Sequence, residues 1–302
     1  MNKVLITGAS GFVGKNLLSF LRNTHYLVET LSLRNPDWEN NSISANVIVN
    51  LVGKAHDHKG QATEADFMES NLGLTRRLFD VFLKSDASLF IHISSIAALE
   101  EENALAVVTE DYIPNPKSFY GHSKKMAEEY LLSQALPQNK KMIILRPTMI
   151  HGPGDKGNLV LLFKIINKGI PYPLGAFDNE RSFIGVDNLC YVIERIINSR
   201  HTIISGAYNV ADDESLSTLQ IINTIGKITN KKALVLKIPV VIIKFLAKAG
   251  DYLKLPLNSK RLTKMTSTMI VSNSKIKEAL SIEKLPLSAQ ESLDRTIKSF
   301  IS

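Results

Sequence analysis

The sequence has very little cysteine. Its 302 residues include one, Cys190, so no disulfide can form within the chain. This usage is typical of proteins from a reducing compartment, and we expect a cytoplasmic location. Cys190 lies in a stretch with a helical pattern, which predicts a buried structural thiol rather than a nucleophile. Glycine and proline, at 16 and 11 residues, are too scarce for a collagen-like or low-complexity chain.

The chain also lacks a recognisable secretory signal and a membrane-spanning run. A strand pattern begins directly after the first residues, without the apolar core and cleavage site of a signal peptide. The best apolar candidate, residues 233–250, is interrupted by Lys237, Pro239, Lys244 and Lys248. Charges at this spacing make a bilayer span unfavourable. We therefore expect no transmembrane segment, and this stretch predicts a strand followed by an amphipathic helix.

Positive charge is distributed unevenly. The formal net charge is +7, but residues 225–302 contain 15 lysines and arginines against 5 acidic residues, which leaves the rest of the chain at −3. A basic C-terminal quarter fits either a solvated face or a surface for an anionic ligand. Aromatic and basic residues do not alternate here as they do in nucleic-acid modules, so we expect no nucleic-acid partner.

Short apolar runs alternate with helical patterns in the N-terminal half of the chain. Strands are expected at residues 4–6, 26–33, 47–52, 89–93 and 142–145, and helices at 15–22, 69–84, 118–135 and 159–168. This alternation predicts an α/β fold with a doubly wound, Rossmann-type parallel sheet. After Gly152 the texture changes. We expect a sheet domain of residues 1–155 plus about 176–200, and a smaller C-terminal substrate domain of residues 156–175 and 201–302.

A glycine-rich loop joins the first strand to the first helix. Gly8, Gly11 and Gly14 stand three residues apart, where they allow a tight turn, the approach of a pyrophosphate and close packing of helix on strand. The helix N-terminus offers free N–H groups to phosphates. The position predicts a dinucleotide site. The alternatives are a structural turn and a nucleotide-hydrolase loop, which would require Gly at Ala9 and Ser or Thr at Asn16.

The end of the second expected strand bears on the choice between NAD and NADP. An acidic residue there usually binds the adenosine ribose, but this sequence has Ser32, followed by Arg34. A missing carboxylate removes the charge that repels a 2′-phosphate, and Arg34 is able to bind one. These residues favour NADP over NAD. The alternative interpretation is a solvated arginine, with Asp37 serving the ribose.

Tyr120 and Lys124 form the first candidate reactive pair. At positions i and i+4 they share one helix face, where an ammonium is expected to lower the pKa of a phenol. Such a phenol can exchange a proton with a sugar hydroxyl while hydride moves. Ser95 follows a buried strand 25 residues earlier, at the edge where α/β folds bind ligands. Its hydroxyl is expected to bind the same substrate oxygen, although capping of the strand end is an alternative role.

Together these motifs resemble the extended short-chain dehydrogenases/reductases, also called the NAD-dependent epimerase/dehydratase family. The resemblance runs from Lys3 to about Leu285. It includes the Thr-Gly-x-x-Gly-x-x-Gly loop, Ser95 with Tyr120-x-x-x-Lys124, the Arg-Pro…Gly-Pro segment from Arg146, Gly157-Asn158-Leu159 and the stretch 181–189. It implies a general acid/base role for Tyr120, nicotinamide-ribose binding by Lys124, and a homodimer formed through residues 69–84 and 118–135.

The resemblance also implies the binding residues. Those for the cofactor are Gly8, Ser10, Gly11, Phe12, Val13, Gly14, Arg34, Leu51, Val52, Gly53, Tyr120, Lys124 and Pro147. Besides Ser95, Asn158 and Arg181 are implied for the substrate, at its diphosphate; Arg261 is either a further ligand or a surface arginine.

One departure from the family pattern narrows the function. Ile96 and Ala97 replace the Asp-Glu pair that 4,6-dehydratases typically carry after the serine, which disfavours dehydration. A separate motif, His56-Asp57-His58, has no third ligand cluster nearby in the sequence. We therefore expect a solvated or substrate-facing loop, with His56 approaching the sugar, rather than a metal site. We expect a 4-ketoreductase that acts on a UDP-N-acetylhexosamine in surface-polysaccharide synthesis. The alternatives are a UDP-sugar 4-epimerase with tightly bound NAD and a non-catalytic dinucleotide sensor.

Overall fold

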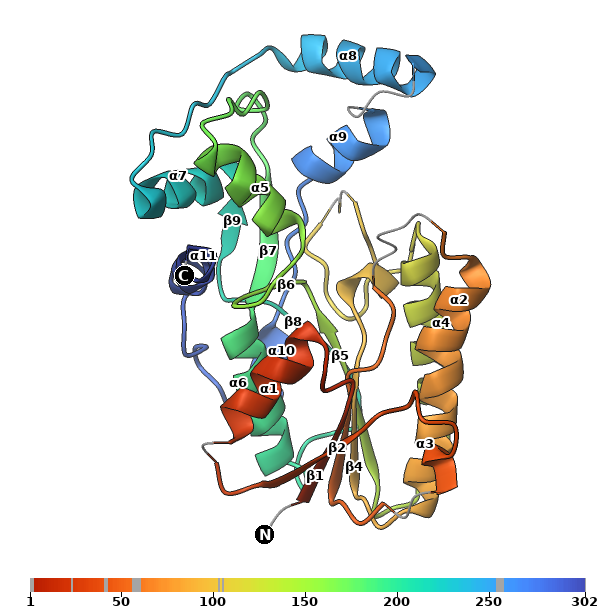
Figure 1. Cartoon of the computed structure of the whole chain (residues 1–302). Coiled ribbons are helices and arrows are strands. Elements are labelled where there is room, and N and C mark those ends of the chain that lie inside the picture. The colour runs from red at the N-terminus through yellow and green to blue at the C-terminus, as the bar shows by residue number, and fades with distance from the viewer. Residues whose placement is uncertain are drawn as a thin grey trace.

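A six-stranded parallel sheet forms the centre of the larger part of the molecule (Figure 1). The computed structural model describes residues 3–22, 24–40, 43–55, 61–102, 104, 106–253 and 258–301. The strand order is β2-β1-β3-β4-β5-β8. The strands are β1 (Lys3–Thr7), β2 (Leu27–Leu31), β3 (Val47–Asn50), β4 (Leu89–Ile93), β5 (Lys141–Pro147) and β8 (Gly206–Val210). The order reverses at β1, and the crevice beside such a reversal is where doubly wound sheets bind ligands.

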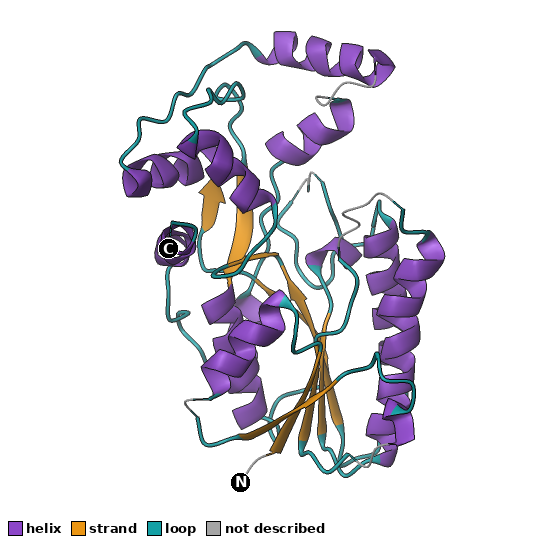
Figure 2. Ribbon diagram, viewed as in Figure 1, coloured by secondary structure: helices purple, strands orange, loops and turns teal. Residues whose placement is uncertain are grey.

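Helices cover both faces of this sheet (Figure 2). On one face lie α1 (Phe12–Leu21), α6 (Val186–Asn198) and α10 (Ser274–Leu280). On the other lie α3 (Leu74–Lys84) and α4 (Phe119–Leu132). The strands inside the sheet, β1, β3, β4 and β5, are mainly apolar and buried on both sides, whereas the edge strand β2 is largely exposed. The expected α/β, doubly wound fold is confirmed.

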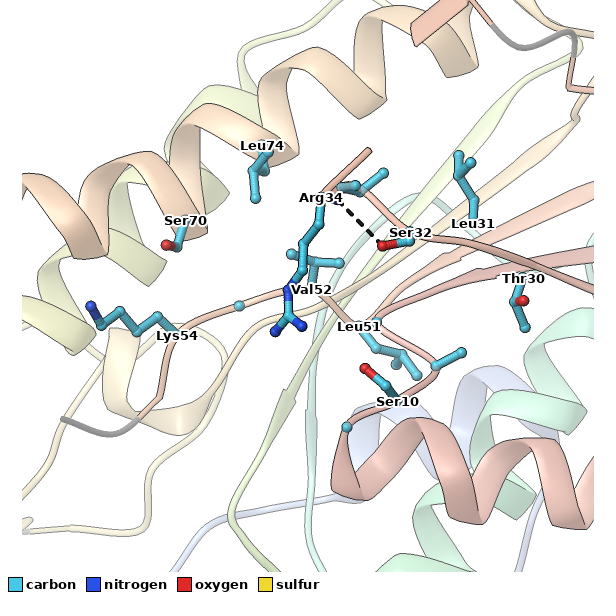
Figure 3. Close-up of a pocket in the computed structure, with 15 residues that line it drawn as sticks. Ser10, Thr30, Leu31, Ser32, Arg34, Leu51, Val52, Lys54, Ser70 and Leu74 are labelled. Atoms are coloured by element: carbon cyan, nitrogen blue, oxygen red, sulfur yellow. Dashed lines mark hydrogen bonds between the residues drawn. The ribbon is translucent and has the colours of Figure 1, made fainter. Parts of the chain in front are cut away.

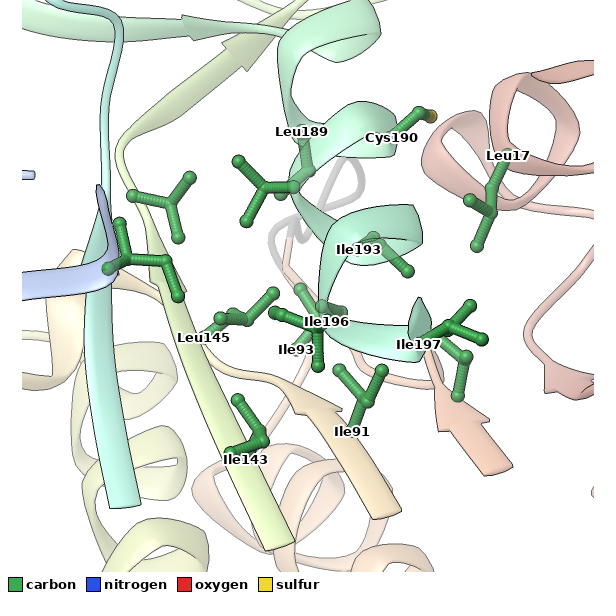
Figure 4. Close-up of a cluster of buried hydrophobic side chains, with 14 of the residues drawn as sticks. Leu17, Ile91, Ile93, Ile143, Leu145, Leu189, Cys190, Ile193, Ile196 and Ile197 are labelled. Atoms are coloured by element: carbon green, nitrogen blue, oxygen red, sulfur yellow. The ribbon is translucent and has the colours of Figure 1, made fainter. Parts of the chain in front are cut away.

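The core between α1, α6 and the sheet includes the lone cysteine. Figure 4 shows Leu17 of α1 and Ile193 of α6 packed over Ile91 and Ile143 of the strands, with Cys190 between the helices. Burial raises the pKa of the Cys190 thiol to about 12, with a smaller contribution from a nearby carboxylate. The thiol is therefore protonated at neutral pH and packs as an apolar group, as expected.

A smaller part of the molecule is built on a three-stranded sheet in the order β6-β7-β9. Its strands are β6 (Met149–His151), β7 (Glu180–Gly185) and β9 (Ser215–Ser217). Its helices are α5 (Asn158–Asn167), α7 (Thr218–Thr229), α8 (Val240–Leu253), α9 (Ser259–Thr266) and α11 (Ala289–Ser299). A second apolar cluster fills the space between them.

Two expected elements differ in the structure. The helix expected at residues 69–84 starts earlier, with α2 (Glu64–Met68), a π-helical turn (Glu69–Gly73) and then α3. Thr63 and Asp66 form a capping box that fixes this earlier start. In addition, β8 lies within residues 201–302, which we assigned to the substrate domain, yet it pairs with β5 of the six-stranded sheet. The remaining domain boundaries stay a prediction. Across the described residues, no helix is long and apolar enough to cross a membrane.

Candidate functional site

The glycine-rich loop closes tightly between β1 and α1. Gly8 has φ +71°, and an added Cβ would lie 2.8 Å from the carbonyl carbon of Leu51. At Gly14 an added Cβ would lie 2.5 Å from the carbonyl oxygen of Gly8. Gly11 is the N-cap of α1, and its N–H donates to the Gly8 carbonyl at 3.0 Å. The sequence therefore brings a helix N-terminus to the sheet edge with no side chain in the way, which suits a phosphate group.

A pocket of about 700 Å³ opens beside this loop (Figure 3). Its volume lies within the usual range for small-molecule sites. The pocket is lined by Gly8, Ala9, Ser10, Gly11, Thr30, Leu31, Ser32, Leu33, Arg34, Leu51, Val52, Gly53, Lys54, Ser70 and Leu74. Seven of the residues expected to bind the cofactor are thus brought together: Gly8, Ser10, Gly11, Arg34, Leu51, Val52 and Gly53.

Arg34 lies at the mouth of this pocket. In Figure 3 its side chain extends across the opening toward Ser10, and its backbone N–H donates to the Ser32 hydroxyl at 3.4 Å. No carboxylate is among the residues that line the pocket. The described wall of the pocket thus offers the Arg34 guanidinium, the Lys54 ammonium and the hydroxyls of one threonine and three serines to an anionic group.

The other expected cofactor residues lie near the pocket rather than in its lining. Phe12 and Val13 open α1, and the Phe12 ring lies 3.6 Å from where Gly152 would carry a Cβ. Pro147 ends β5, the second strand along the sheet from β3.

Ser95 and Tyr120 meet at the carboxyl end of β4. Ser95 precedes a 3-10 turn, Ile96–Ala98, and its hydroxyl accepts a hydrogen bond from Ala97 N at 3.2 Å. The same side chain lies close enough to Tyr120, in the first turn of α4, to lower the pKa of the phenol. The capping role of Ser95 is therefore present, and its contact with a substrate oxygen stays a prediction. The turn packs so closely on α4 that a Cβ at Gly121 would lie 2.5 Å from Ala97 O.

Lys124 connects this pair to the cofactor pocket. Its ammonium is buried, donates to Ile93 O at 2.8 Å, and lies 3.0 Å from where Gly53 would carry a Cβ. Burial lowers the pKa of Lys124 to about 8, although the carboxylate of Glu128 opposes this shift. The lysine is thus protonated at neutral pH and close to losing its proton.

The Tyr120 phenol behaves differently from the expectation. Its pKa is raised, first by burial and then by the carboxylates of Glu101 and Glu128, while the hydrogen bond with Ser95 lowers it. We expected Lys124 to lower the pKa of this phenol, and in the protein without cofactor it does not. Burial destabilises the phenolate more than Ser95 stabilises it. Tyr120 therefore holds its proton at neutral pH.

A buried ion pair joins α4 to β5 close to Lys124 and Tyr120. Arg146 donates to Glu128 at 2.7 and 2.9 Å, and Ser94 donates to the other oxygen of the same carboxylate. Glu128 lies one helical turn after Lys124, so the i, i+4 spacing was a signal that our sequence analysis missed. Its negative charge supports the protonated form of Lys124.

Asn71 is a second residue that the sequence analysis missed. It is fully buried in the π-helical turn. Its amide donates to the Ser123 hydroxyl at 2.8 Å and to Lys54 O at 3.1 Å, and it accepts from Lys54 N at 2.8 Å. Asn71 therefore holds α4 against the pocket-lining segment after β3. Nothing in the spacing of the surrounding apolar residues indicates the π turn that aims it.

The expected diphosphate residues lie on the smaller part of the molecule. Asn158 opens α5 and is exposed. The Arg181 guanidinium donates to Ser267 Oγ at 2.8 Å and to Lys264 O at 3.1 Å, at the C-terminal end of α9. Arg261 lies in the first turn of α9 and is exposed. Arg181, on β7, thus contacts the C-terminal end of α9, and Arg261 lies at the opposite end of that helix.

The histidine segment we considered lies elsewhere. His56, Asp57 and His58 fall outside the described residues. Among the residues that are described, no group of three His, Cys, Asp or Glu side chains is placed to hold a metal ion.

Comparison with known proteins agrees with this geometry. Residues 4–211 match the model of the NAD dependent epimerase/dehydratase family. The chain is 28% identical to a UDP-glucose 4-epimerase of Vibrio cholerae, over 99% of this chain and 95% of that protein. It is 25% identical to an N-acetyl-α-D-glucosaminyl-diphospho-ditrans,octacis-undecaprenol 4-epimerase of Escherichia coli O157:H7, over 98% and 95%.

A solved structure has the same fold. RMD from Pseudomonas aeruginosa, in complex with NADPH, superposes with a TM-score of 0.77 at 20% identity and covers all of both chains. The family match includes the glycine-rich loop, Ser95, Tyr120 and Lys124 within one continuous segment. The chain is therefore an enzyme of the NAD dependent epimerase/dehydratase family.

Proposed function

We propose that this enzyme transfers hydride between NAD(P) and carbon 4 of a UDP-linked N-acetylhexosamine, as a 4-ketoreductase. The observation that carries the proposal is the packing of the turn after Ser95 on the first turn of α4, which carries Tyr120, together with the buried Lys124 ammonium beside Gly53 of the pocket. When bound, the nicotinamide supplies or takes up the hydride. The residues of the chain orient the sugar and move the proton.

The protonation state of Tyr120 suits the proton transfer that reduction requires. In reduction of a 4-keto group, Tyr120 gives its proton to the developing alkoxide while Ser95 donates a hydrogen bond to the same oxygen. A phenol whose pKa is raised starts this step with its proton in place. The Lys124 ammonium then stabilises the phenolate that remains, since it lies one turn further along α4.

The cofactor that we propose is NADP, with NAD as the alternative. The pocket suits a dinucleotide because its glycine loop leaves room for a pyrophosphate. Ser32 and Arg34 support NADP, since a guanidinium and a hydroxyl recognise a 2′-phosphate and no carboxylate among the lining residues repels it. The similar structure from Pseudomonas aeruginosa was solved in complex with NADPH, which is consistent with this choice.

A second candidate function is 4-epimerisation on tightly bound NAD. The names of the Vibrio cholerae and Escherichia coli relatives favour it. Both reactions use the same tyrosine, lysine and serine, so the two differ in cofactor retention. Mass spectrometry of gently purified protein is expected to find no retained NAD for a ketoreductase, and about one NAD per chain for an epimerase.

For the substrate we propose a UDP-sugar held at its diphosphate by Asn158, Arg181 and Arg261. Arg261 lies in the first turn of α9, and Arg181 of β7 contacts the other end of that helix. The asparagine lies at the N-terminus of α5, where an anion is favoured. Replacing Asn158 or Arg181 by alanine is expected to raise the KM for a UDP-sugar about tenfold. Unchanged KM values would remove the diphosphate role.

The test of the reaction uses Tyr120→Phe. We expect kcat to fall by a factor of about 10² to 10⁴, since general acid catalysis contributes about that much, while the affinity for the cofactor is retained. Tyr130→Phe, on the same helix, is the matched control, because its hydroxyl donates to Asp80 on the surface. Turnover by Tyr120→Phe at the wild-type rate would exclude this mechanism and favour a dinucleotide sensor.

We further propose a homodimer in the cytoplasm. One side of α4 exposes Phe119 and Met126, which suits a helix-on-helix interface with a second copy. Light scattering of the purified protein distinguishes a dimer of about twice 33.5 kDa from a monomer.

A further inference from the structure

Helix α8 projects from the smaller part of the molecule, at the end opposite the chain's N-terminus (Figure 1). One side of the helix packs on the body. Ile243 and Ala247 are buried there in the second apolar cluster, together with Leu262 of α9, and Gly250 is buried one turn further. The remaining circumference of α8 has no covering element in the part of the chain that the structure describes (Figure 2).

The uncovered side of α8 is strongly apolar. We call it the α8 face, and it consists of Val241, Ile242, Phe245, Leu246, Tyr252 and Leu253, whose exposed fractions are 78, 50, 70, 47, 88 and 68%. At 3.6 residues per turn these six side chains occupy one continuous arc of about 140°. Single exposed apolar residues are ordinary, but a contiguous group on one helix marks an interaction site.

Lysines border the α8 face on one side. Lys244 and Lys248 follow one another along the helix, next to the apolar arc, and both are exposed. Lys237 precedes the helix, within the basic C-terminal quarter of the chain. The nearest acid on the helix, Asp251, is an exposed carboxylate that accepts hydrogen bonds from the Ser259 N–H and hydroxyl at 2.9 and 2.6 Å. The three lysines outnumber this one acid, so the net charge beside the apolar arc of α8 is positive.

We propose that the α8 face binds the surface of an anionic lipid bilayer. A helix with an apolar arc beside lysines lies in the plane of the interface, with its apolar side chains among the upper acyl chains and its lysines at the head groups. Each lysine near an anionic surface adds to binding, whereas a protein partner would require complementary acids instead. A helix of 14 residues is too short to span the bilayer, so the enzyme would bind peripherally.

Co-sedimentation with lipid vesicles tests this proposal. The probes are vesicles of phosphatidylcholine with 30% phosphatidylglycerol, used at about 50 and 500 mM salt, and vesicles of phosphatidylcholine alone. We expect the wild type to bind the anionic vesicles, about tenfold more weakly at the higher salt, and to bind neutral vesicles poorly. Val241→Ser with Phe245→Ser should weaken binding at least tenfold, and so should Lys244→Glu with Lys248→Glu.

Ile113→Ser is the matched control, because Ile113 is 84% exposed in a loop far from α8 in sequence. It should bind vesicles like the wild type. Equal binding by the wild type and the Val241→Ser/Phe245→Ser variant would overturn the proposal. A second outcome would also overturn it: the wild type binds no vesicles, forms a dimer in sedimentation velocity, and loses that dimer in the Val241→Ser/Phe245→Ser variant. The α8 face would then bind a second copy of the chain. Turnover of a water-soluble UDP-sugar without vesicles should be the same in all these variants, so the proposed reaction is tested separately.

Discussion

Glu128 and Arg146 form an ion pair inside the protein, with 2.7 Å between a carboxylate oxygen and Nη2. The pair does more than join α4 to β5, because the carboxylate also acts on the two reactive side chains. It raises the pKa of Lys124 and that of Tyr120. Glu128 does not line the pocket beside the glycine-rich loop, yet its carboxylate contributes to the pKa values of the two side chains that we propose as the reactive pair.

The first prediction follows from this coupling. The pKa of Lys124 is about 8, so its ammonium is lost as the pH rises through that value, and kcat/KM should fall above pH 8. Glu128→Gln removes the charge that supports the ammonium. Because the pKa of Lys124 then falls further, the alkaline decline of kcat/KM should move to a lower pH, as read from a pH–rate profile.

Glu129→Gln is the control for this shift, because Glu129 lies next in sequence but is exposed and pairs with Lys125 at 3.5 Å. Its profile should match that of the wild type. Glu128→Gln also leaves Arg146 without its anion, which is expected to cost about 3 kcal/mol of stability. Folding is therefore checked by circular dichroism before the profile is measured. An alkaline decline that stays at the wild-type pH would contradict the coupling.

The second prediction concerns Asn71. Asn71→Ala removes the hydrogen bonds to Lys54 and Ser123 and leaves buried partners unpaired, so the free energy of unfolding should fall by about 1–3 kcal/mol. Because those bonds position Lys124 beside Gly53, kcat should fall as well. Urea unfolding and steady-state kinetics measure the two effects. Asn167→Ala, at the end of α5, is the control, since the contact that the structure gives it is made by its backbone carbonyl. A loss of stability with unchanged kcat would reduce Asn71 to a structural role.

The third prediction separates two glycines of the loop. A Cβ at Gly14 would lie 2.5 Å from Gly8 O, whereas one at Gly11 would lie 3.2 Å from the same atom. Gly14→Ala must therefore displace the backbone, and should cost about 1–3 kcal/mol of stability. Gly11→Ala should leave stability nearly unchanged but weaken NADPH binding, because the methyl group occupies the approach of the pyrophosphate. Thermal unfolding compares the stability of the two variants, and a fluorescence titration compares their affinity for NADPH. Equal losses of stability in the two variants would contradict the separate roles of Gly11 and Gly14.

The sequence predicted the structure best where a motif allows only one backbone conformation. The apolar runs at residues 47–52 and 89–93 became β3 and β4, and the glycine spacing predicted the turn that Gly8 makes with φ +71°. The family of the chain followed from the same residues. These features depend on local chemistry, which a sequence displays directly.

Other features depend on contacts between distant segments, and the sequence does not display them. The π turn that buries Asn71 is decided by Lys54 and Ser123, 17 and 52 residues away. The raised pKa of Tyr120 follows from burial under the turn after Ser95, so the i+4 lysine alone suggested the wrong direction for the protein without cofactor. The pairing of β8 with β5 likewise arises from a segment that resembles no motif.

The last prediction tests the 2′-phosphate role of Arg34. Arg34→Ala should weaken NADPH binding about tenfold, because a charge-assisted contact of roughly 1.5 kcal/mol or more is lost, and should leave NADH binding nearly unchanged. Isothermal titration calorimetry measures the affinity for each of the two nucleotides. Arg22→Ala is the control, since Arg22 is exposed just past the last residue of α1 and does not line the pocket. If the wild type binds NADPH and NADH with equal affinity, or if the variant keeps its affinity for both, then the Arg34 guanidinium does not recognise the 2′-phosphate. The choice between the cofactors would then depend on contacts of the ribose with the loop that includes Asp37, and Asp37→Ala should weaken NADH binding instead.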